Sequence, residues 1–321
     1  MKGIFWNCNG FADVKKYRFL SDLTKEKNLD FIALSETGRG SFLLSTLNNI
    51  CAGRDFVWHC MAPRGRSGGM LLGINLVIFD IGEIDEGDFL IRFKLRHKHD
   101  DIKFNLISVY GPAQLDQKSN FLSEFLRICS KETLPLVIGG DFSIIRRPGE
   151  KNNNNYSDRW PFLFNVVIDT LNLRELEMSC RRFTWANHMQ NQTFEKLDRV
   201  LVCNDFEFKF PHSTLHALSR EISYHTPLFL NTNNPSSSYQ PQFKFELRWL
   251  MREGFCDMVQ DVWNSVIVTG TPLERWQAKI RRLRQYLRGW AKNISGAYKK
   301  EKQTLLNKLD EIDKKRQKVL F

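Results

Sequence analysis

Short apolar runs alternate with amphipathic segments over the first 230 or so residues of the chain. The apolar runs have the length of single strands, and they predict strands at 1–7, 29–36, 68–75, 89–97, 103–111, 134–141, 182–187 and 196–203. Between them, apolar residues recur three or four positions apart, which predicts helices at 14–28, 119–131 and 157–172. Strands and helices that alternate in this way are typical of an α/β domain.

The pattern changes after the polar, Pro- and Ser-containing stretch NTNNPSSSYQPQ at 231–242. This stretch predicts a linker between a first domain at 1–230 and a helical extension at 243–321. In the extension, one apolar stripe runs from Trp276 to Ile294 and a second from Leu305 to Val319. Two stripes joined near Gly296 predict a helical hairpin, or helices that associate through 276–319 with a second copy or another partner.

The extension also holds most of the positive charge. The net charge of the chain is +11, and residues 241–321 contain 18 Lys and Arg against 9 Asp and Glu, which leaves +2 for residues 1–240. Such an excess suits the binding of a polyanion such as DNA or RNA. A Lys-rich helix face that only meets solvent has the same composition. Composition therefore leaves both interpretations open.

Several classes of protein are disfavoured by what the sequence lacks. No apolar run reaches the length of about 18 residues that a membrane span needs. The first residues, MKGIFWN, are too short an apolar run for a secretory signal peptide. The seven cysteines are scattered without a CxxC pair, which argues against a structural zinc site and a disulfide framework. We expect an intracellular protein with reduced thiols.

Polar residues that apolar burial would not select stand at the ends of successive predicted strands or close beside them. They are Asn7, Asn9, Glu36, Tyr110, Asp141, Asp198 and His225. In α/β folds ligands collect at strand ends, so these side chains are expected to converge on one cleft. For any one of them alone, a role as a loop or capping residue is the better explanation, so the argument depends on their number.

Seven short motifs follow one another in an order that resembles a known family. They are WNCNG, ALSET, VYGP, IGGDFS, RRFTWAN, KLDRVLV and LSREISYHTP, between residues 6 and 227. This series resembles the exonuclease–endonuclease–phosphatase superfamily, and most closely the endonuclease domain of plant non-LTR (LINE-type) retrotransposons. The segments FKFELRWL and LRQYLRGWAKNISG resemble the part that joins this endonuclease to a reverse transcriptase. The chain is thus expected to be an open reading frame truncated before the reverse transcriptase.

The resemblance implies a four-layer α/β/β/α sandwich of two mixed β-sheets that hydrolyses phosphodiesters in DNA with Mg²⁺, or alternatively Mn²⁺. Matched by position, Glu36 corresponds to the metal-binding carboxylate and Asp141 to the acid–base residue. The other matches are Asn7 and Asn9 as supports of the metal and a phosphate oxygen, Tyr110 as a phosphate contact, His225 as the phosphate-binding imidazole and Asp198 as the carboxylate that orients it. A DNA substrate implies access to the nucleus.

Two positions depart from the family pattern. Ser143 stands where the family has Asn after the Gly-Gly-Asp-Phe sequence, and Tyr224 stands where it has Asp before the histidine. A serine hydroxyl is shorter than an asparagine amide and offers fewer fixed donors. Tyrosine brings no negative charge at neutral pH and is bulkier than aspartate. Both changes predict weakened or lost catalysis.

Three functions remain open on the sequence. The chain is a metal-dependent endonuclease that nicks one DNA strand, a catalytically inactive protein that binds DNA or RNA, or a helical interaction module in residues 243–321. The first function is favoured by the retained residues Asn7, Glu36, Tyr110, Asp141, Asp198 and His225. Ser143 and Tyr224 together with the basic extension favour the second, and the apolar stripes favour the third.

Overall fold

The structure is a computed structural model that describes residues 1–63, 68–187, 189, 191–232, 245–265 and 271–318. The chain forms two compact units, residues 1–237 with 316–321 in the first and residues 238–315 in the second. The expected linker at 231–242 lies mostly outside the described residues. Thr232 still belongs to the first unit by contact, because its backbone N–H donates to the carbonyl oxygen of Met1 at 2.9 Å.

One sheet of the first unit has seven strands in the order β10-β14-β15-β1-β2-β4-β3. The pairs β1–β2 and β10–β14 are parallel, and the other neighbouring strands of this sheet pair antiparallel. The strands are β1 (Lys2–Asn7), β2 (Phe31–Ser35), β3 (Phe56–Met61), β4 (Met70–Asn75), β10 (Met178–Ser179), β14 (Thr214–Ala217) and β15 (Leu228–Asn231).

The second sheet has six strands in the order β5-β6-β7-β8-β13-β9. Its one parallel pair is β7–β8, so this sheet is mixed as well. A separate short hairpin is formed by β11 and β12. The strands are β5 (Phe79–Glu86), β6 (Leu90–His97), β7 (Lys103–Tyr110), β8 (Leu136–Asp141), β9 (Leu173–Glu175), β11 (Trp185–Ala186), β12 (Phe194–Glu195) and β13 (Asp198–Cys203).

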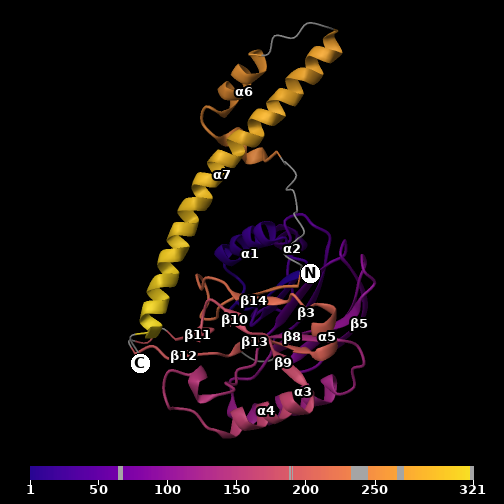
Figure 1. The fold of residues 1–321 in the computed structure, drawn as a ribbon, viewed down its shortest axis with the longest axis vertical. Helices are drawn as coiled ribbons and strands as arrows, with labels where there is room; N and C mark the ends of the chain where they lie inside the picture. Colours follow the sequence, from indigo (N-terminus) through magenta and orange to yellow (C-terminus); the bar gives the residue numbers. More distant parts are fainter. Residues whose placement is uncertain (64–67, 188, 190, 233–244, 266–270, 319–321) are drawn as a thin grey trace. The chain divides into compact units, whose positions relative to one another are not determined.

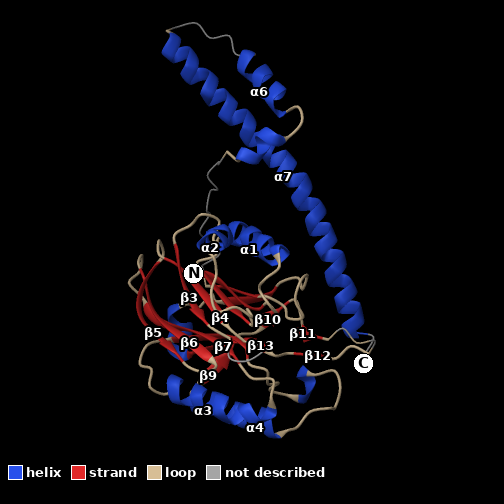
Figure 2. Cartoon of the chain, turned by 180° about the vertical axis from the view of Figure 1, so that it is seen from behind, coloured by secondary structure: helices blue, strands red, loops and turns tan. Residues whose placement is uncertain are grey.

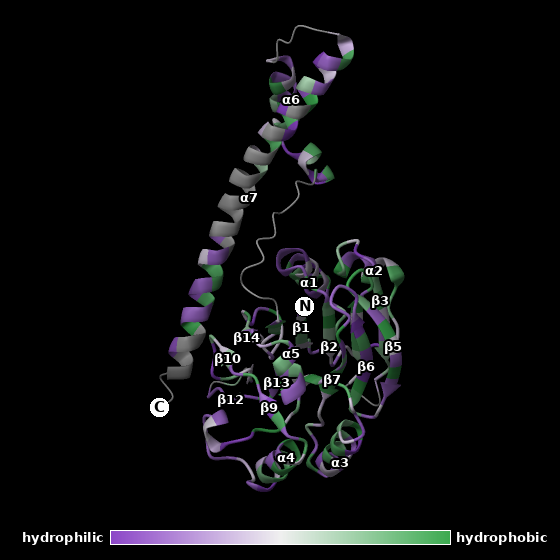
Figure 3. Ribbon diagram, turned by 45° about the vertical axis from the view of Figure 1, so that its right-hand side comes forward, coloured by the Kyte–Doolittle hydropathy of each residue, from purple (hydrophilic) through white to green (hydrophobic). Residues whose placement is uncertain are grey.

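Helices cover the outer faces of both sheets (Figures 1 and 2). Helices α1 (Val14–Lys27) and α2 (Leu44–Ile50) pack their buried leucines and isoleucine against β1, β2 and β4. Helices α3 (Lys118–Cys129) and α4 (Arg159–Thr170) cover the other sheet. Helix α3 carries hydrophobic residues on one side and hydrophilic ones on the other (Figure 3), as expected for a helix between sheet and solvent. The expected four-layer sandwich is confirmed.

The largest apolar cluster fills the space between the two sheets. It includes Phe5, Leu72, Phe93, Leu106 and Val137, each at most 1% exposed. Burial of apolar surface of this kind is the main favourable term in folding. The short helix α5 (Asn204–Lys209) closes one end of this cluster with a buried phenylalanine. The sheets are therefore held face to face, and their edges have a defined relative position.

The second unit is a small helical assembly. It consists of the 3₁₀ helix η3 (Leu247–Met251), α6 (Phe255–Asn264) and α7 (Pro272–Lys318). Trp249, Phe255 and Leu287 form its core, and the ring of Trp290 packs at an angle of 51° against that of Phe255 with centroids 4.9 Å apart. None of the helices in the described part of the chain has the length and apolar character needed to cross a membrane.

The expected helical hairpin near Gly296 is wrong. Helix α7 is continuous from Pro272 to Lys318 and passes through Gly296 without a turn. A single glycine costs a helix only about 1 kcal/mol relative to alanine, which a long helix tolerates. The first apolar stripe of α7 packs instead against η3 and α6, through Leu283, Leu287 and Trp290.

Gly139 in β8 is expected to be a packing requirement of the sandwich. A Cβ atom there would lie 2.6 Å from the Phe5 ring of the opposite sheet. Gly139→Ala should therefore lower the free energy of unfolding by about 1–3 kcal/mol, measured by urea denaturation. Gly82→Ala is the matched control, because its nearest neighbour would be 3.5 Å away. Equal stability of the two variants would contradict the proposed close packing.

Candidate active site

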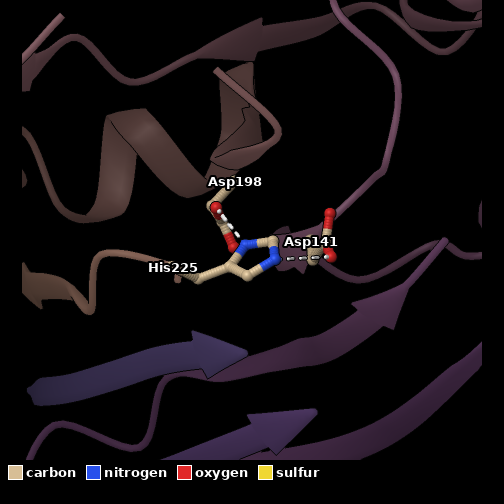
Figure 4. A group of neighbouring side chains, drawn as sticks. All are labelled: Asp141, Asp198 and His225. Atoms are coloured by element: carbon tan, nitrogen blue, oxygen red, sulfur yellow. Dashed lines mark hydrogen bonds and ion pairs between the residues drawn. The ribbon is translucent and has the colours of Figure 1, made fainter. Parts of the chain in front are cut away.

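Three ionisable side chains form a chain of contacts at one edge of the sandwich (Figure 4). The imidazole Nδ1 of His225 is 2.9 Å from Oδ2 of Asp198, and its Nε2 is 3.7 Å from Oδ2 of Asp141. All three residues are buried, with exposed fractions of 2–6%. The ring of His225 lies between the two carboxylates, so each of its nitrogen atoms faces a carboxylate oxygen.

The strand register brings these residues together. Asp198 begins β13 and lies opposite Asp141, the last residue of β8, in an antiparallel pair. Tyr110 ends β7 and lies opposite Asp141 in the parallel pair on the other side. His225 precedes β15, which pairs with β1 in the other sheet. The edge at which β1, β2, β7 and β8 end therefore carries the predicted residues from both sheets.

Gly140 allows β8 to approach β7 closely before Asp141. Its φ is +136°, and a Cβ atom there would lie 2.2 Å from the carbonyl oxygen of Val109. No side chain can replace hydrogen at that distance. Gly140 thus allows Asp141 to lie beside the end of β7. The close contacts at Gly139 and Gly140 account for the two glycines that precede the acidic residue.

Asn7 connects the two sheets within the site. Its Nδ2 donates to Oδ2 of Asp141 at 2.8 Å, while its Oδ1 accepts from the backbone N–H of Asn9 at 3.0 Å. Asn7 is 1% exposed. Because donor and acceptor are both used, the amide is held in one orientation, which presents Asp141 to the cleft with a fixed geometry. Asn9 therefore enters the site through its backbone.

Glu36 stands directly after β2 and is half-buried. Burial raises its pKa, and the hydrogen bond from Asn7 and the charge of His225 oppose that rise. A partly desolvated carboxylate that faces solvent on one side is suited to a divalent cation. Carboxylate and amide oxygens are the ligands that Mg²⁺ prefers. Glu36 and the neighbouring Asn7 amide fit such an ion by their donor types.

Three of the predicted site residues have left-handed backbone conformations. The φ angles are 48° at Asn9, 56° at Glu36 and 51° at Ser143. Glutamate and serine seldom adopt this region, and such strain persists only where surrounding structure imposes it. Here the loops after β1 and β2 are tied together, since the N–H of Gly10 donates to the carbonyl oxygen of Glu36 at 2.6 Å. Strained residues of this kind cluster at functional sites.

Ser143 is turned back onto Asp141. Its backbone N–H and its hydroxyl donate to Oδ1 of Asp141, at 2.8 and 3.3 Å. The hydroxyl thus bonds to the carboxylate two residues earlier, and its short arm cannot reach as far as the asparagine of the family pattern. Removal of one preorganised donor from such a site costs about 10²–10³ in rate.

The segment around Tyr224 is positioned by its neighbours. The hydroxyl of Ser223 donates to the carbonyl oxygen of Asn7 at 2.8 Å and accepts from the N–H of His225 at 3.1 Å. The N–H of Ala186 donates to the carbonyl oxygen of Tyr224. The Tyr224 side chain is 37% exposed. The backbone on both sides of Tyr224 is therefore fixed by hydrogen bonds next to His225.

Sequence reasoning missed two residues that organise the site. The ammonium group of Lys16 donates to the carbonyl oxygens of Cys8, Asn9 and Gly10 at 2.6–2.8 Å. The hydroxyl oxygen of Thr184 accepts from the N–H of Asp198 at 2.9 Å. Lys16 lies within a helix pattern and carries no local signal. Thr184 lies inside the RRFTWAN motif, which could have indicated it.

The charges of the site reinforce one another. Burial alone lowers the pKa of His225, but Asp198 and Asp141 outweigh it and raise the pKa to about 9. Burial raises the pKa of Asp198, and the neighbouring imidazolium opposes that rise. His225 and Asp198 share one titratable proton. We place it on the imidazole, because the carboxylate of Asp141 also attracts it. At neutral pH the site then presents a cation that suits an anionic phosphate.

The same three residues also satisfy the spacing of a metal site, since their ligand atoms lie within 4.8 Å of one another. Metal ligation requires a neutral imidazole. The pKa of His225 is raised to about 9, which disfavours that form at neutral pH. Its Nδ1 is also engaged by Asp198. Glu36 is therefore the better candidate for the metal ligand.

The histidine predicts a specific pH dependence of stability. Its pKa rises from 6.5 to about 9 on folding, so the folded state binds more protons between these values. The contribution, about 3 kcal/mol, is fully present below pH 6.5 and is lost as the pH rises through 9. Urea unfolding of the parent and of His225→Gln between pH 6 and 10 measures it as the difference. Parallel stability curves for the two proteins would contradict the ion pair.

Three solved structures resemble the first unit at low sequence identity. The endonuclease domain of TRAS1, a telomere-specific non-LTR retrotransposon, aligns with a TM-score of 0.55 and 11% identity over 73% of this chain and 99% of its own. The 3′-5′ exonuclease from Neisseria meningitidis aligns with 0.55 and 16% over 72% and 99%. An AP endonuclease from Archaeoglobus fulgidus gives 0.55 and 14% over 72% and 98%. At such identities the likeness establishes the fold.

The sequence itself identifies the family. No curated protein sequence matches the chain. The sequence model of the Endonuclease/Exonuclease/phosphatase family matches residues 4–225, a range that contains Asn7, Glu36, Asp141, Asp198 and His225. The match spans more than half of the chain, and it agrees with the two-sheet fold and with the family resemblance of the motifs. The chain belongs to the Endonuclease/Exonuclease/phosphatase family.

Proposed function

We propose that the chain is a metal-dependent phosphodiesterase that nicks one strand of DNA, with activity reduced by Ser143 and Tyr224. The observation that carries this proposal is the contact chain of Asp198, His225 and Asp141, to which Asn7 of the other sheet is also bonded. An imidazolium beside a buried carboxylate can bind a phosphate and handle a proton at the same place. An arrangement made only for stability has no need of such a desolvated ion pair.

Each site residue has a role that its surroundings support. Asp141 accepts a proton from the attacking water, since Asn7 and Ser143 hold its two oxygens in place. His225 donates to a non-bridging phosphate oxygen from Nε2, because Asp198 occupies Nδ1. Tyr110 is half-buried at the neighbouring strand end, where its phenol is suited to a further phosphate contact.

The residues present fit a divalent cation, with Mg²⁺ as the expected ion and Mn²⁺ as a substitute. Glu36 would hold it, supported by the Asn7 amide, and Asn9 would shape the loop through its backbone. The bound ion would neutralise and polarise the scissile phosphate. Every other step falls to the protein: His225 orients the phosphate, and Asp141 takes a proton from the attacking water and returns one to the leaving oxygen.

We further propose that the chain derives from the endonuclease region of a plant non-LTR retrotransposon. The ordered motifs support this origin, and the fold of a retrotransposon endonuclease domain agrees with it. A related solved structure, a 3′ phosphatase from Neisseria, is described as bound to a product DNA hairpin, which favours DNA as the substrate class here. Action on chromosomal DNA requires access to the nucleus.

Two other functions have some support in the structure. The bond between the Ser143 hydroxyl and Asp141, together with the phenol at 224, favours a protein that binds nucleic acid without cleaving it. Leu305, Leu309 and Ile312 on α7 are 49–56% exposed and lie at helical spacing, which favours an interaction module. Neither observation accounts for the buried ion pair at the edge of the sandwich.

Loss of the metal-binding carboxylate should abolish nicking. The purified protein is incubated with supercoiled plasmid and Mg²⁺, and open-circular product is measured over time. Glu36→Ala should reduce the rate by about 100-fold or more, since it removes the carboxylate proposed to hold the metal ion. Glu26→Ala is the matched control, because that glutamate is exposed on α1. If parent and Glu36→Ala produce the same trace of nicked plasmid, the proposed metal-dependent cleavage is refuted.

Restoration of the family residues should raise activity. Ser143→Asn returns a fixed amide donor beside Asp141, and Tyr224→Asp returns a carboxylate before His225. Each single change should increase the nicking rate, and the double variant should exceed the parent by about 10²-fold or more. The two gains need not multiply, because residues that act as a unit are not additive. A folded double variant that nicks no faster than the parent would show that these positions are not what limits catalysis.

A further inference from the structure

A cavity of about 350 Å³ lies outside the residues of the candidate active site. We call it the arginine pocket, and it is lined by Arg147, Gly149, Glu150, Met178, Arg181, Arg182 and Lys196. Its volume falls within the range of about 300–1,000 Å³ that ligand sites span. Four of its lining residues are cationic and one is acidic, so the pocket is suited to an anion.

The carboxylates in and below the pocket already have cationic partners. Glu150 is 3.2 Å from the fully buried guanidinium of Arg199. Glu175, beneath the pocket, is 2.9 Å from Arg146 and 2.5 Å from Lys196. Burial alone raises the pKa of Glu175, but Arg199 and Lys196 outweigh it and lower the pKa to about 2. These carboxylates are therefore neutralised from within.

The positive charge that remains is local. Among the charged residues that line the pocket or pair with its floor, six are cationic (Arg146, Arg147, Arg181, Arg182, Lys196 and Arg199) and two are acidic (Glu150 and Glu175). Their sum is +4, whereas residues 1–240 carry only +2. The other residues of 1–240 thus sum to −2. The pocket is where an anion meets a favourable field on an otherwise nearly neutral domain.

The pocket is built from the same chain segments as the candidate active site. Arg147 follows Asp141 in the loop after β8, and Lys196 stands two residues before Asp198. Arg181 and Arg182 precede Thr184, whose hydroxyl holds the Asp198 backbone. A DNA strand bound at His225 and Asp141 would therefore lie beside chain segments that also line the arginine pocket.

The guanidinium groups at the rim are placed for phosphate contacts. Arg147 and Arg182 are exposed, and Arg182 is fixed in direction because its Nε and Nη2 donate to the carbonyl oxygen of Gly149 at 3.2 and 2.9 Å. An arginine fork matches the oxygens of a phosphate better than an ammonium group does. A fixed guanidinium also loses less conformational freedom on binding.

We propose that the arginine pocket binds a backbone phosphate of the DNA substrate away from the scissile one. The inference rests on the proposed function, because it takes DNA as the substrate. It assigns backbone binding to the first unit, in addition to the basic helices of the extension. Phosphate contacts of this kind position a duplex without reading its sequence.

The test measures binding rather than cleavage. Fluorescence anisotropy with a labelled 20-base-pair duplex in EDTA gives the dissociation constant of the full chain between 50 and 300 mM KCl. Arg147→Gln and Arg182→Gln should each weaken binding by about fivefold near 150 mM salt and reduce the slope of log K against log[salt] by about one. The double variant should lose about two units of slope.

Matched variants separate charge from structure. Arg18→Gln removes an exposed arginine from α1 and should leave both affinity and slope unchanged. Arg147→Lys with Arg182→Lys retains the charge and should keep the salt slope of the parent. A merely structural role of Arg182 would lower the thermal midpoint of the Gln variant without changing that slope.

The outcomes distinguish the pocket from the proposed function. The proposed phosphate site would be overturned if the Gln variants kept the affinity and salt slope of the parent. It would also be overturned if the parent did not bind DNA. Weakened binding in the Gln variants supports the phosphate site whether or not the protein cleaves DNA. If neither the parent nor the Ser143→Asn, Tyr224→Asp double variant nicks plasmid, only the proposed cleavage fails. An RNA duplex of the same sequence that binds as tightly would support backbone contact and remove the preference for DNA.

Discussion

The hydrogen bond between Asn7 and Asp141 is the contact on which the site depends. It joins the end of β1 in one sheet to the end of β8 in the other at 2.8 Å, with both residues buried. A bond of this length tolerates little change in the spacing of the sheets. Gly139 provides that spacing, because only hydrogen leaves room for the Phe5 ring opposite. The core between the sheets and the geometry of the site are therefore one constraint.

The charge of His225 follows from the two carboxylates beside it, which outweigh the effect of burial. A histidine between two buried carboxylates keeps its proton to about pH 9, since separating the charges in a poorly solvated place is costly. The same burial raises the pKa of Glu36, whose ionised form would be favoured by a divalent cation. The site thus places an imidazolium near a half-buried carboxylate, which supports the proposed binding of a metal ion and an anionic phosphate. Ser143 leaves this electrostatic framework intact and reduces the number of fixed donors around Asp141.

The sequence predicts the first unit much better than the second. The first unit has buried strands, strand-end polar residues and ordered motifs, and its family and four-layer fold were predicted correctly from them. The second has only helical periodicity, which predicts helices well but says little about where they turn. Gly296 looked like a turn because two apolar stripes meet there. Helix α7 continues through it, because its first stripe is already covered by Trp249 and Phe255 from η3 and α6.

The sequence by itself determined the central strands and three helices of the first unit, the family and the strand-end positions of the candidate site residues, because apolar runs, strand-end polar residues and motif order are local properties. It missed β3 and β5 and the short helices α2 and α5. Only the tertiary structure decided what the site residues contact. It showed that Lys16 and Thr184 hold the loops and strand ends of the site, and that Arg147, Arg181 and Arg182 line one pocket with Lys196. Such contacts join residues far apart in the chain, and strand pairing across two sheets brings them together. A local sequence pattern contains no information on contacts between residues so far apart in the chain.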